Sequence, residues 1–536
     1  MEKRFNITGR CIPNWHYMAD VSKKLGQTCQ LIEYSEYFTI NRPRQYGKTT
    51  LLDTLAKTLR ATNEYVVFNI SFGGIGDAIF NDEVVFSEGF VNVLATYAKH
   101  QIPELAAWLQ AAVKGTTSLD LLSEVITKLV TQTDKKVVLF IDEVDKSSNN
   151  QLFVSFLAML REKYLIRDSV KTFHSIVLAG LHDVKSLKLK LRPNEEQKYN
   201  SPWNIAADFK VDMNLQPSEI KPMLDEYCQD SGVKMDTEWM ANRLFYFTSG
   251  YPYLVSKLCK IIDEDILPTK NGEAETSKIG QEWTEEDLNQ AFALILKESN
   301  NANFDTLMNN LEHYPALYKL VFSVIFDGEA QAFSGDDPTV NLGVLHGIFA
   351  ESASGHVMIQ NRIYRERIAN MMVSVWHTSQ RGTFNPISEG FDLRGSYRLP
   401  NGGLDMEKVL NNFQVFMREN HSDKDRKFLE RDGRIIFFAF LKPIINGSGY
   451  EFKEPQISDE KRLDVVITFN QFKYVVELKL WYGAVAHEKG LVQLADYLER
   501  QSLQTGYLLI FDHSKKKSWK KDWIEVEGKR ILWARV

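Results

Sequence analysis

The first 260 residues alternate short apolar runs with longer stretches in which apolar residues recur every three or four positions. Four of the runs are short and continuous, so we expect them to form strands buried on both faces: 37–40, 65–72, 136–141 and 175–180. The stretches between them, such as 49–61 and 121–132, have the period of amphipathic helices. Strands that alternate with helices predict a parallel sheet covered on both faces.

The pattern changes after residue 215. A mainly helical stretch reaches about residue 325, and two helical runs, a turn at Gly355 and a strand-like run at 356–359 then fit a small winged-helix domain. Residues 378–404 are polar, Gly-rich and poorly periodic, and we interpret them as a linker. Four later apolar runs lie among helical stretches and predict a second α/β domain: 435–441, 463–469, 474–481 and 506–511.

The length of 536 residues exceeds the roughly 250–300 residues of one core, so several domains are expected. No apolar run approaches the roughly 18 residues of a membrane span, and the first ten residues lack the apolar core of a signal peptide. The four cysteines (Cys11, Cys29, Cys228 and Cys259) lie too far apart for a disulfide framework or a zinc site. These features predict a cytoplasmic protein that does not span a membrane.

The run 42–50 has the order of elements that phosphate binding requires. An apolar strand leads to Gly47, Lys48, Thr49 and Thr50, and an amphipathic helix follows. Backbone N–H groups at a helix start bind the anion, a lysine reaches the outer phosphates, and a hydroxyl ligates magnesium. The full G-x-x-x-x-G-K-[ST] pattern has glycine where this chain has Arg42, so the pattern by itself is incomplete.

A second apolar strand, about 90 residues further on, ends in Asp142 and Glu143. An Asp at the carboxyl end of a buried strand can hold magnesium through water, and the next Glu can orient or deprotonate an attacking water. Alone, this pair equally fits the start of an exposed loop. Together with the upstream loop it predicts ATP hydrolysis, with Thr49 and Asp142 as metal ligands and Glu143 as a catalytic residue.

Four segments resemble the AAA-like ATPases of the STAND type: 41–52, 139–145, 247–258 and 357–368. The resemblance covers about residues 10–375 and implies a P-loop NTPase core, a helical lid and a winged helix. Loops of this family often have Pro-Arg-Gln in place of the first glycine, which accounts for Arg42. The nucleotide-binding residues that it implies are Arg44, Gln45, Tyr46, Gly47, Lys48, Thr49, Thr50 and Asp142.

The segment 14–20 precedes the first strand, and the same resemblance implies that Tyr17 contacts the adenine ring. A surface turn is the other interpretation of this segment.

The C-terminal apolar runs 463–469 and 474–481 flank a polar centre at Asn470 and Gln471. A hairpin centred there places Asp464 directly opposite Glu477, with Cβ atoms roughly 5 Å apart. The period of two along a strand puts Lys479 on the same face as Glu477. Two facing carboxylates repel each other unless a cation or proton lies between them, so we expect Asp464 and Glu477 to be metal ligands.

Acids and a lysine in this arrangement suit phosphodiester hydrolysis, because a bound Mg²⁺ polarises the phosphate and lowers the pKa of a water. The spacing of Asp464, Glu477 and Lys479 resembles the PD-(D/E)xK nuclease core, over about residues 405–515. The family often supplies a further acid, here Glu430, and Gln493 and Tyr497 match the QxxxY element of its RecB-type members. A Pro normally precedes the first Asp, and here that residue is Leu463.

The two resemblances predict an ATP-binding and hydrolysing switch that controls a metal-dependent nuclease. The expected cofactors are ATP and Mg²⁺, with Mn²⁺ as a substitute, and the expected partners are nucleic acid, DNA favoured over RNA, and further copies of the chain. A role in defence against phage or other foreign DNA is consistent with this layout by analogy. The alternative is a nucleotide-dependent signalling or regulatory scaffold that binds nucleic acid through a degenerate nuclease fold.

Charge distinguishes these alternatives only weakly. Residues 405–536 carry 23 Lys and Arg against 20 Asp and Glu, in a chain whose net charge is −6. The small excess is consistent with a polyanionic partner and equally with chance variation over a globular surface.

The predicted fold class is α/β throughout, with a C-terminal restriction-endonuclease-like domain. The expected boundaries run in chain order: an AAA-like ATPase core at 1–215, a helical lid at 216–300, a winged helix at 301–377, a linker at 378–404 and a nuclease domain at 405–536.

Overall fold

The computed structural model describes most of the chain. The described residues are 3–74, 77–144, 151–181, 203–270, 278–299, 301–327, 331–379, 397–420, 436–438, 440–441, 444–445, 449–453, 464–469, 472–481, 484–512 and 518–536. They form two compact units: Met1–Leu288 with Leu345–Gly347, and Asn289–Val344 with Ile348–Val536. The finer boundaries expected from the sequence stay predictions.

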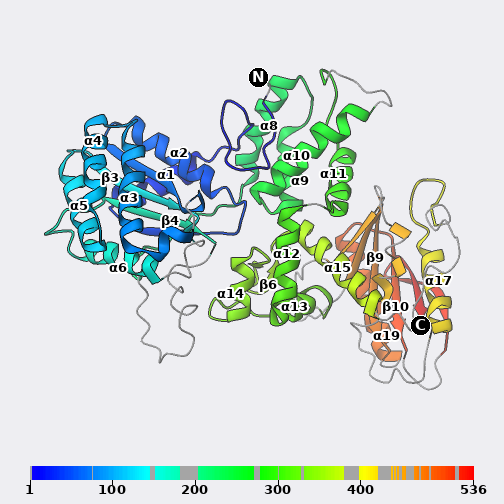
Figure 1. Ribbon diagram of the computed structural model, residues 1–536. Helices are drawn as coiled ribbons and strands as arrows, with labels where there is room; N and C mark the ends of the chain where they lie inside the picture. The colour runs from blue at the N-terminus through cyan, green and yellow to red at the C-terminus, as the bar shows by residue number, and fades with distance from the viewer. Residues whose placement is uncertain are drawn as a thin grey trace, which may run out of the picture. The chain divides into compact units, whose positions relative to one another are not determined.

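A four-stranded parallel sheet is the centre of the first unit (Figure 1). Its strands are β1 (Phe38–Asn41), β2 (Tyr65–Ser71), β3 (Lys136–Asp142) and β4 (Ser175–Gly180), in the order β1-β4-β3-β2. Strand β3, one of the two inner strands, is buried at every position after Lys136, which is why its sequence is continuously apolar instead of alternating. The predicted parallel sheet is thus confirmed.

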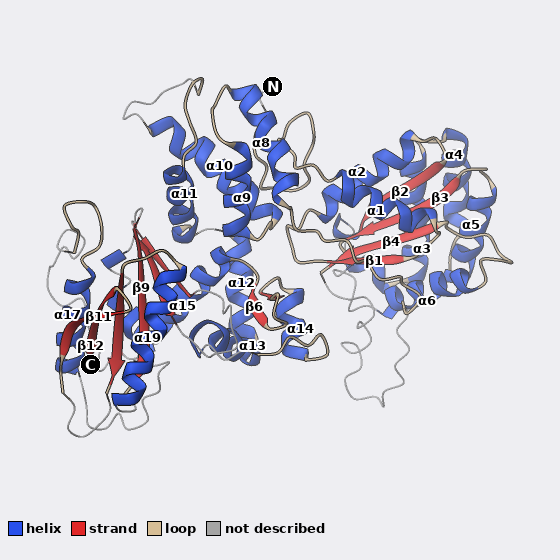
Figure 2. Ribbon diagram, turned by 180° about the vertical axis from the view of Figure 1, so that it is seen from behind, coloured by secondary structure: helices blue, strands red, loops and turns tan. Residues whose placement is uncertain are grey.

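Helices cover both faces of this sheet (Figure 2). The helices around the sheet are α1 (Ser22–Glu33), α2 (Lys48–Ala61), α3 (Glu83–Ala98), α4 (Pro103–Ala112), α5 (Leu119–Thr131) and α6 (Gln151–Leu165). Helices α3 to α6 share one apolar core with alternate residues of the strands, including Leu139 and Ile141 of β3. The helix α2 packs against β2 and β3 through buried residues outside that core, among them Leu52 and Leu55. Because side chains alternate along β3, Asp142 points to the α2 side.

A helical part follows in the same unit, with α8 (Pro217–Ser231), α9 (Thr237–Thr248), α10 (Pro252–Ile261) and the start of α11 (Glu285–Lys297). The N-terminal segment lies beside α8 (Figure 1), where the Phe5 ring packs on Tyr227 at 5.1 Å. Gly250, between α9 and α10, has φ +74°, and its carbonyl oxygen accepts a hydrogen bond from the N–H of Leu215 at 2.7 Å. This tight junction fixes where α10 begins.

The second unit opens with three helices, α12 (Ala302–His313), α13 (Pro315–Phe322) and α14 (Pro338–Leu345). A hairpin of β5 (Phe349–Glu351) and β6 (Val357–Ile359) follows, and α15 (Arg362–Ser379) comes after it. Gly355, at φ +75°, lies in the turn of this hairpin, as the sequence predicts. Assignment of these elements to a winged helix stays a prediction.

A six-stranded mixed sheet forms the remainder of the second unit (Figure 2). Its strands are β7 (Gly449–Lys453), β8 (Asp464–Phe469), β9 (Phe472–Leu480), β10 (Thr505–Phe511), β11 (Lys521–Val526) and β12 (Lys529–Arg535), in the order β11-β12-β10-β9-β8-β7. Strands β7, β8 and β9 are antiparallel, whereas β9, β10 and β12 are parallel. Helices α17 (Met406–Asn420) and α19 (Ala484–Arg500) belong to the same part of the chain.

Helix α19 connects β9 to β10 and closes the core of this sheet. Leu494 and Leu498 pack with Val475 of β9 and Leu508 of β10 in one apolar cluster. A crossover helix of this kind is what joins two parallel neighbours in a sheet. Three of the four apolar runs after residue 404 lie in strands β8, β9 and β10, which agrees with the predicted second α/β region. The fourth run, 435–441, is helical in its described residues, so it is not a strand.

The Gly250 junction yields a stability prediction. A Cβ at Gly250 would lie 2.2 Å from the Leu215 carbonyl oxygen, at a backbone angle that L residues rarely adopt. Gly250→Ala should therefore lower the free energy of unfolding by roughly 2–4 kcal/mol. Gly26→Ala is the control, because a Cβ there meets nothing within 4 Å and lies inside α1. The control substitution should raise the free energy of unfolding by about 0.5–1 kcal/mol. Thermal unfolding measures both, and equal melting temperatures would contradict the junction's role.

Candidate functional site

The segment between β1 and α2 forms a compact loop that ends in a left-handed glycine. Gly47 has φ +76° and is the N-cap of α2, which begins at Lys48. No side chain caps this helix start, so the N–H groups of its first turn keep their capacity to bind an anion. The positive φ also explains why position 47 is glycine. The loop geometry therefore suits a phosphate group.

Lys48 spans the loop. Its Nζ donates to the carbonyl oxygens of Arg42, at 2.7 Å, and Pro43, at 2.8 Å. The ammonium group is consequently held over the loop by backbone oxygens. A phosphate approaching the first turn of α2 would meet this charge directly.

Arg42 stands where the usual pattern has glycine, and its side chain is directed into neighbouring structure. One guanidinium nitrogen donates to the Asn41 carbonyl at 2.9 Å, and the other donates to the Val211 carbonyl at 3.1 Å. The guanidinium also lies 5.8 Å from the centre of the Phe209 ring. With its side chain bound in this way, Arg42 anchors the start of the loop.

Thr49 and Asp142 meet although 93 residues separate them. The Thr49 hydroxyl donates to Asp142 Oδ2 at 2.5 Å, and the N–H of Glu143 donates to Asp142 Oδ1 at 2.9 Å. Asp142 is 5% exposed, and this burial raises the pKa of its carboxyl group above the usual value. A hydroxyl and a carboxylate are oxygen donors of the class that Mg²⁺ prefers, so this pair fits a magnesium ion.

Glu143 is exposed and has a left-handed backbone, with φ +57°. Residues without glycine's freedom hold such angles at a free-energy cost, and they cluster at functional sites. The Ser71 hydroxyl donates to Glu143 Oε2 at 3.1 Å. Ser71 is the last residue of β2 and lies beside Asp142 in the sheet register. Sequence reasoning missed Ser71, although its place at the end of a predicted strand was the available signal.

The other residues predicted to bind nucleotide lie in this loop or in the first turn of α2. The Thr50 hydroxyl accepts the N–H of Cys11 at 3.0 Å. Tyr46 is 5% exposed, and its ring lies 4.4 Å from that of Tyr251. Arg44 follows Pro43 in the loop, and Gln45 has φ +59°.

Tyr17 lies in an aromatic cluster and is 3% exposed. Its ring centre is 5.1 Å from that of Phe5 and 5.4 Å from that of Tyr227. Adenine contact through Tyr17 stays a prediction.

The predicted register of the C-terminal hairpin is confirmed. Asp464 of β8 pairs with Glu477 of β9. Glu477 is 1% exposed, and its Oε1 lies 2.9 Å from the Nζ of Lys479. A carboxylate this deeply buried is costly without a cation beside it, and Lys479 supplies one. The backbone thus places two acidic positions opposite each other, with a lysine on the same face.

The remaining predicted residues of this region are only partly described. Gln493 and Tyr497 lie one helical turn apart on α19, and both are half-buried. Glu430 and the side chain of Asp464 lie outside the described residues. Among the residues that the structure describes, no group of three or more His, Cys, Asp and Glu side chains is placed to hold a metal ion.

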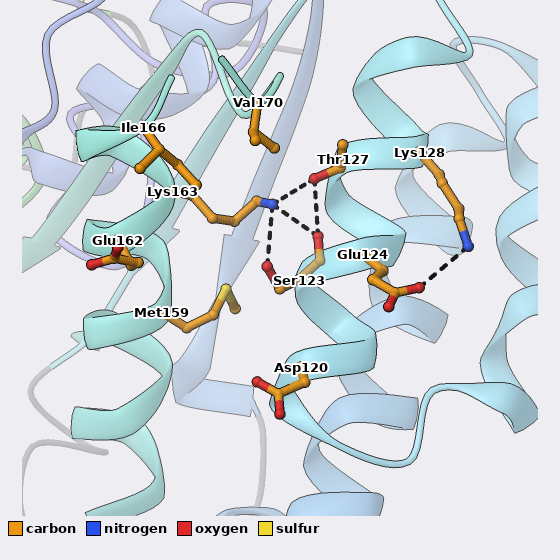
Figure 3. Close-up of a pocket in the computed structure, with 10 residues that line it drawn as sticks. All are labelled: Asp120, Ser123, Glu124, Thr127, Lys128, Met159, Glu162, Lys163, Ile166 and Val170. Atoms are coloured by element: carbon orange, nitrogen blue, oxygen red, sulfur yellow. Dashed lines mark hydrogen bonds and ion pairs between the residues drawn. The ribbon is translucent and has the colours of Figure 1, made fainter. Parts of the chain in front are cut away.

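A pocket of about 610 Å³ lies between α5 and α6, and none of its lining residues belongs to either set of predicted residues (Figure 3). Lys163 of α6 reaches across it, and its Nζ donates to the Ser123 carbonyl and to the hydroxyls of Ser123 and Thr127. Burial lowers the pKa of Lys163. All three acceptors are on α5, so this lysine connects the two helices.

Within the described part of the chain, no helix is long and apolar enough to cross a membrane.

Residues 22–271 match the family model of an AAA-like domain. No match is found among the curated proteins.

Several solved structures are similar to this chain. A Walker-type ATPase of Pyrococcus abyssi has 10% identity and a TM-score of 0.46, over 68% of this chain and 99% of that chain. The ORC2 protein of Aeropyrum pernix, in ADPNP–ADP complexes, has 11% identity and a TM-score of 0.41, over 68% of this chain and 97% of that chain. The ORC1 protein of Aeropyrum pernix, in complex with DNA, has 11% identity and a TM-score of 0.29, over 67% and 94%. Identities and scores this low assign no activity to the chain.

The buried Asp142 carboxylate yields a prediction for the nucleotide-free protein. Because its folded pKa is raised, its favourable contribution to stability exists at low pH and is lost as the pH rises through that pKa. Asp142→Asn removes the buried charge, so at neutral pH the variant should unfold at the same or a higher temperature than the native protein. The difference should shrink as the pH is lowered towards the pKa of Asp142. A variant that is strongly destabilised at neutral pH would contradict this reasoning.

Proposed function

We propose that residues 22–271 bind ATP with Mg²⁺ and hydrolyse it. The observation that carries this proposal is the hydrogen bond between the Thr49 hydroxyl and Asp142, which joins the helix after the loop to the end of β3. These two oxygen donors would hold Mg²⁺, which supplies charge neutralisation on the outer phosphates when bound. The first-turn N–H groups of α2 and the ammonium of Lys48 would bind the phosphates themselves.

We propose that Glu143 is the residue that acts on the attacking water. Its carboxylate would orient that water and accept its proton. The hydrogen bond from Ser71 holds the carboxylate at the carboxyl edge of the sheet, beside Asp142. The hydroxyl of Ser71 therefore acts as a positioning group for Glu143.

Two substitutions separate binding from hydrolysis. Lys48→Ala removes a charge-assisted contact, so the dissociation constant for ATP should rise roughly 10- to 100-fold. Glu143→Gln should bind ATP with native affinity and hydrolyse it at least about 100-fold more slowly, because the proton acceptor is lost. Calorimetry and a phosphate-release assay measure the two effects.

The control for both is Lys57→Ala, on the same helix, where the largely exposed Lys57 side chain pairs with Asp53. It should retain native binding and turnover. Native ATP affinity in Lys48→Ala would show that the loop is not the nucleotide site.

We further propose that the six-stranded sheet carries a metal-dependent site that hydrolyses phosphodiester bonds in nucleic acid, with DNA as the favoured substrate. The pairing of Asp464 with Glu477 and the ion pair between Glu477 and Lys479 support it. The two carboxylates would hold Mg²⁺ or Mn²⁺, which activates a water when bound, and Lys479 would stabilise charge on the phosphate. The residues proposed to assist are Glu430, Gln493 and Tyr497.

ATP would control this cutting through assembly of several copies of the chain, in a cytoplasmic role such as defence against foreign DNA. The control can only be as strong as the difference in ATP affinity between the assembled and the free chain. The competing proposal is a nucleotide-dependent regulatory scaffold that binds nucleic acid without cutting it. The combination of Asp464, Glu477 and Lys479 counts against a degenerate site.

The nuclease proposal is tested on the full-length protein with Mg²⁺ or Mn²⁺ and a panel of DNA and RNA, with and without ATP. Glu477→Gln and Lys479→Ala should each reduce cutting at least about 100-fold, because metal binding and charge stabilisation are lost. Lys473→Ala is the matched control, since Lys473 lies on the same face of β9 and bonds to Gln501. It should cut at the native rate.

The same assay tests the control by ATP. Lys48→Ala should make cutting independent of ATP, and light scattering should show an ATP-dependent change of mass only in the native protein. Native protein that binds nucleic acid but never cuts it would support the scaffold instead.

A further inference from the structure

Three successive backbone carbonyls of the P-loop each accept a hydrogen bond from a side chain. The oxygens of Arg42 and Pro43 accept from Lys48, within the loop's own motif. The oxygen of Arg44 accepts from the hydroxyl of Tyr251, at 2.5 Å. Tyr251 belongs to the helical part of the same unit, 207 residues away in sequence. The third carbonyl is therefore held from outside the loop.

The hydrogen bond at Arg44 fixes the orientation of a whole peptide group. In a planar trans peptide the N–H points opposite to the C=O, so holding the Arg44 oxygen towards Tyr251 turns the N–H of Gln45 away from it. Gln45 itself has φ +59°, an angle that residues other than glycine adopt at a free-energy cost. A strained residue needs surrounding contacts to maintain it, and the Tyr251 hydroxyl supplies one next to it.

Tyr251 contacts the loop a second time through its ring. The rings of Tyr46 and Tyr251 meet edge to face, with centres 4.4 Å apart and planes at 89°. The two side chains are 5% and 1% exposed, so the contact excludes water. Tyr251 is also the N-cap of α10, and the left-handed Gly250 before it is held by Leu215. The hydroxyl is thus presented from a rigid position.

We propose that Tyr251 is a positioning residue for the nucleotide: its hydroxyl holds the peptide between Arg44 and Gln45 so that the Gln45 N–H faces the bound phosphates. This rests on the proposed ATP binding by the loop. Tyr251 does not contact the nucleotide, and it acts only through the backbone of the loop. Nucleotide affinity is therefore linked to packing of α10 against the loop, so that each strengthens the other.

Tyr251→Phe tests the proposal, because it removes the hydroxyl and keeps the ring against Tyr46. The dissociation constants for ATP and ADP and the KM for ATP should rise about three- to tenfold, the range for one hydrogen bond. The kcat should stay within about twofold, because Thr49, Asp142 and Glu143 are unchanged. Tyr251→Leu removes the ring contact as well and should weaken binding further.

The matched control is Tyr37→Phe. Tyr37 is fully buried in the same unit, and its hydroxyl also donates to a backbone carbonyl, that of Phe173, at 3.0 Å. Both Phe variants should lose similar thermal stability, and only Tyr251→Phe should change nucleotide affinity. If Tyr251 had a merely structural role, Tyr251→Phe would lower the melting temperature and leave the dissociation constants unchanged.

The outcomes separate this inference from the proposed function. If the native protein binds ATP and Tyr251→Phe binds it equally well, positioning by Tyr251 is wrong and the ATP site stands. If the native protein and Lys48→Ala both bind no nucleotide, the ATP site itself is wrong, and the positioning role is wrong with it.

Discussion

The parallel alignment of β1, β4, β3 and β2 is the constraint on which the nucleotide site depends. Parallel strands bring their carboxyl ends to the same edge of a sheet, so the loop after β1, the end of β2 and the end of β3 lie together. At that edge the Thr49 hydroxyl reaches Asp142, and Ser71 reaches Glu143. One strand in the opposite direction would move its functional residue to the other edge. The sheet topology therefore determines where the site lies, and the individual side chains determine its chemistry.

Strained backbone and a buried carboxylate occur together at this edge. Gln45 and Glu143 both have left-handed backbones, and Asp142 is a buried carboxylate with a raised pKa. Each of these features lowers the stability of the nucleotide-free fold, and neighbouring hydrogen bonds offset part of that cost. A bound cation and polyphosphate would offset more of it, since the cation would neutralise the buried carboxylate and the phosphates would interact favourably with the N-terminus of α2. A P-loop of this kind is preorganised at a cost to its own stability.

The C-terminal sheet uses a different constraint, the register of an antiparallel hairpin. Pairing of Asp464 with Glu477 follows from where the turn between β8 and β9 lies, and a slip of the register by one residue would place the two acidic positions on opposite faces of the sheet. Strand β9 lies between β8 and β10, and the Glu477 side chain on it is 1% exposed, so its carboxylate needs Lys479 beside it. At Glu477 the cost to stability comes from burial of a carboxylate and not from backbone strain.

The sequence by itself determined the elements and the local order of chemistry. Continuous apolar runs predicted the strands of the parallel sheet, the Gly47-Lys48-Thr49 order predicted the helix start, and symmetry about Asn470 and Gln471 predicted the pairing of Asp464 with Glu477. These signals are local, because they depend on period, turn chemistry and short spacing. Tertiary structure alone decided that Arg42 is an anchor, that Ser71 holds Glu143 and that Tyr251 holds the loop. Those contacts join residues 72 to 207 positions apart, and no periodicity in a single sequence encodes which distant hydroxyl or carbonyl the packed core will bring together.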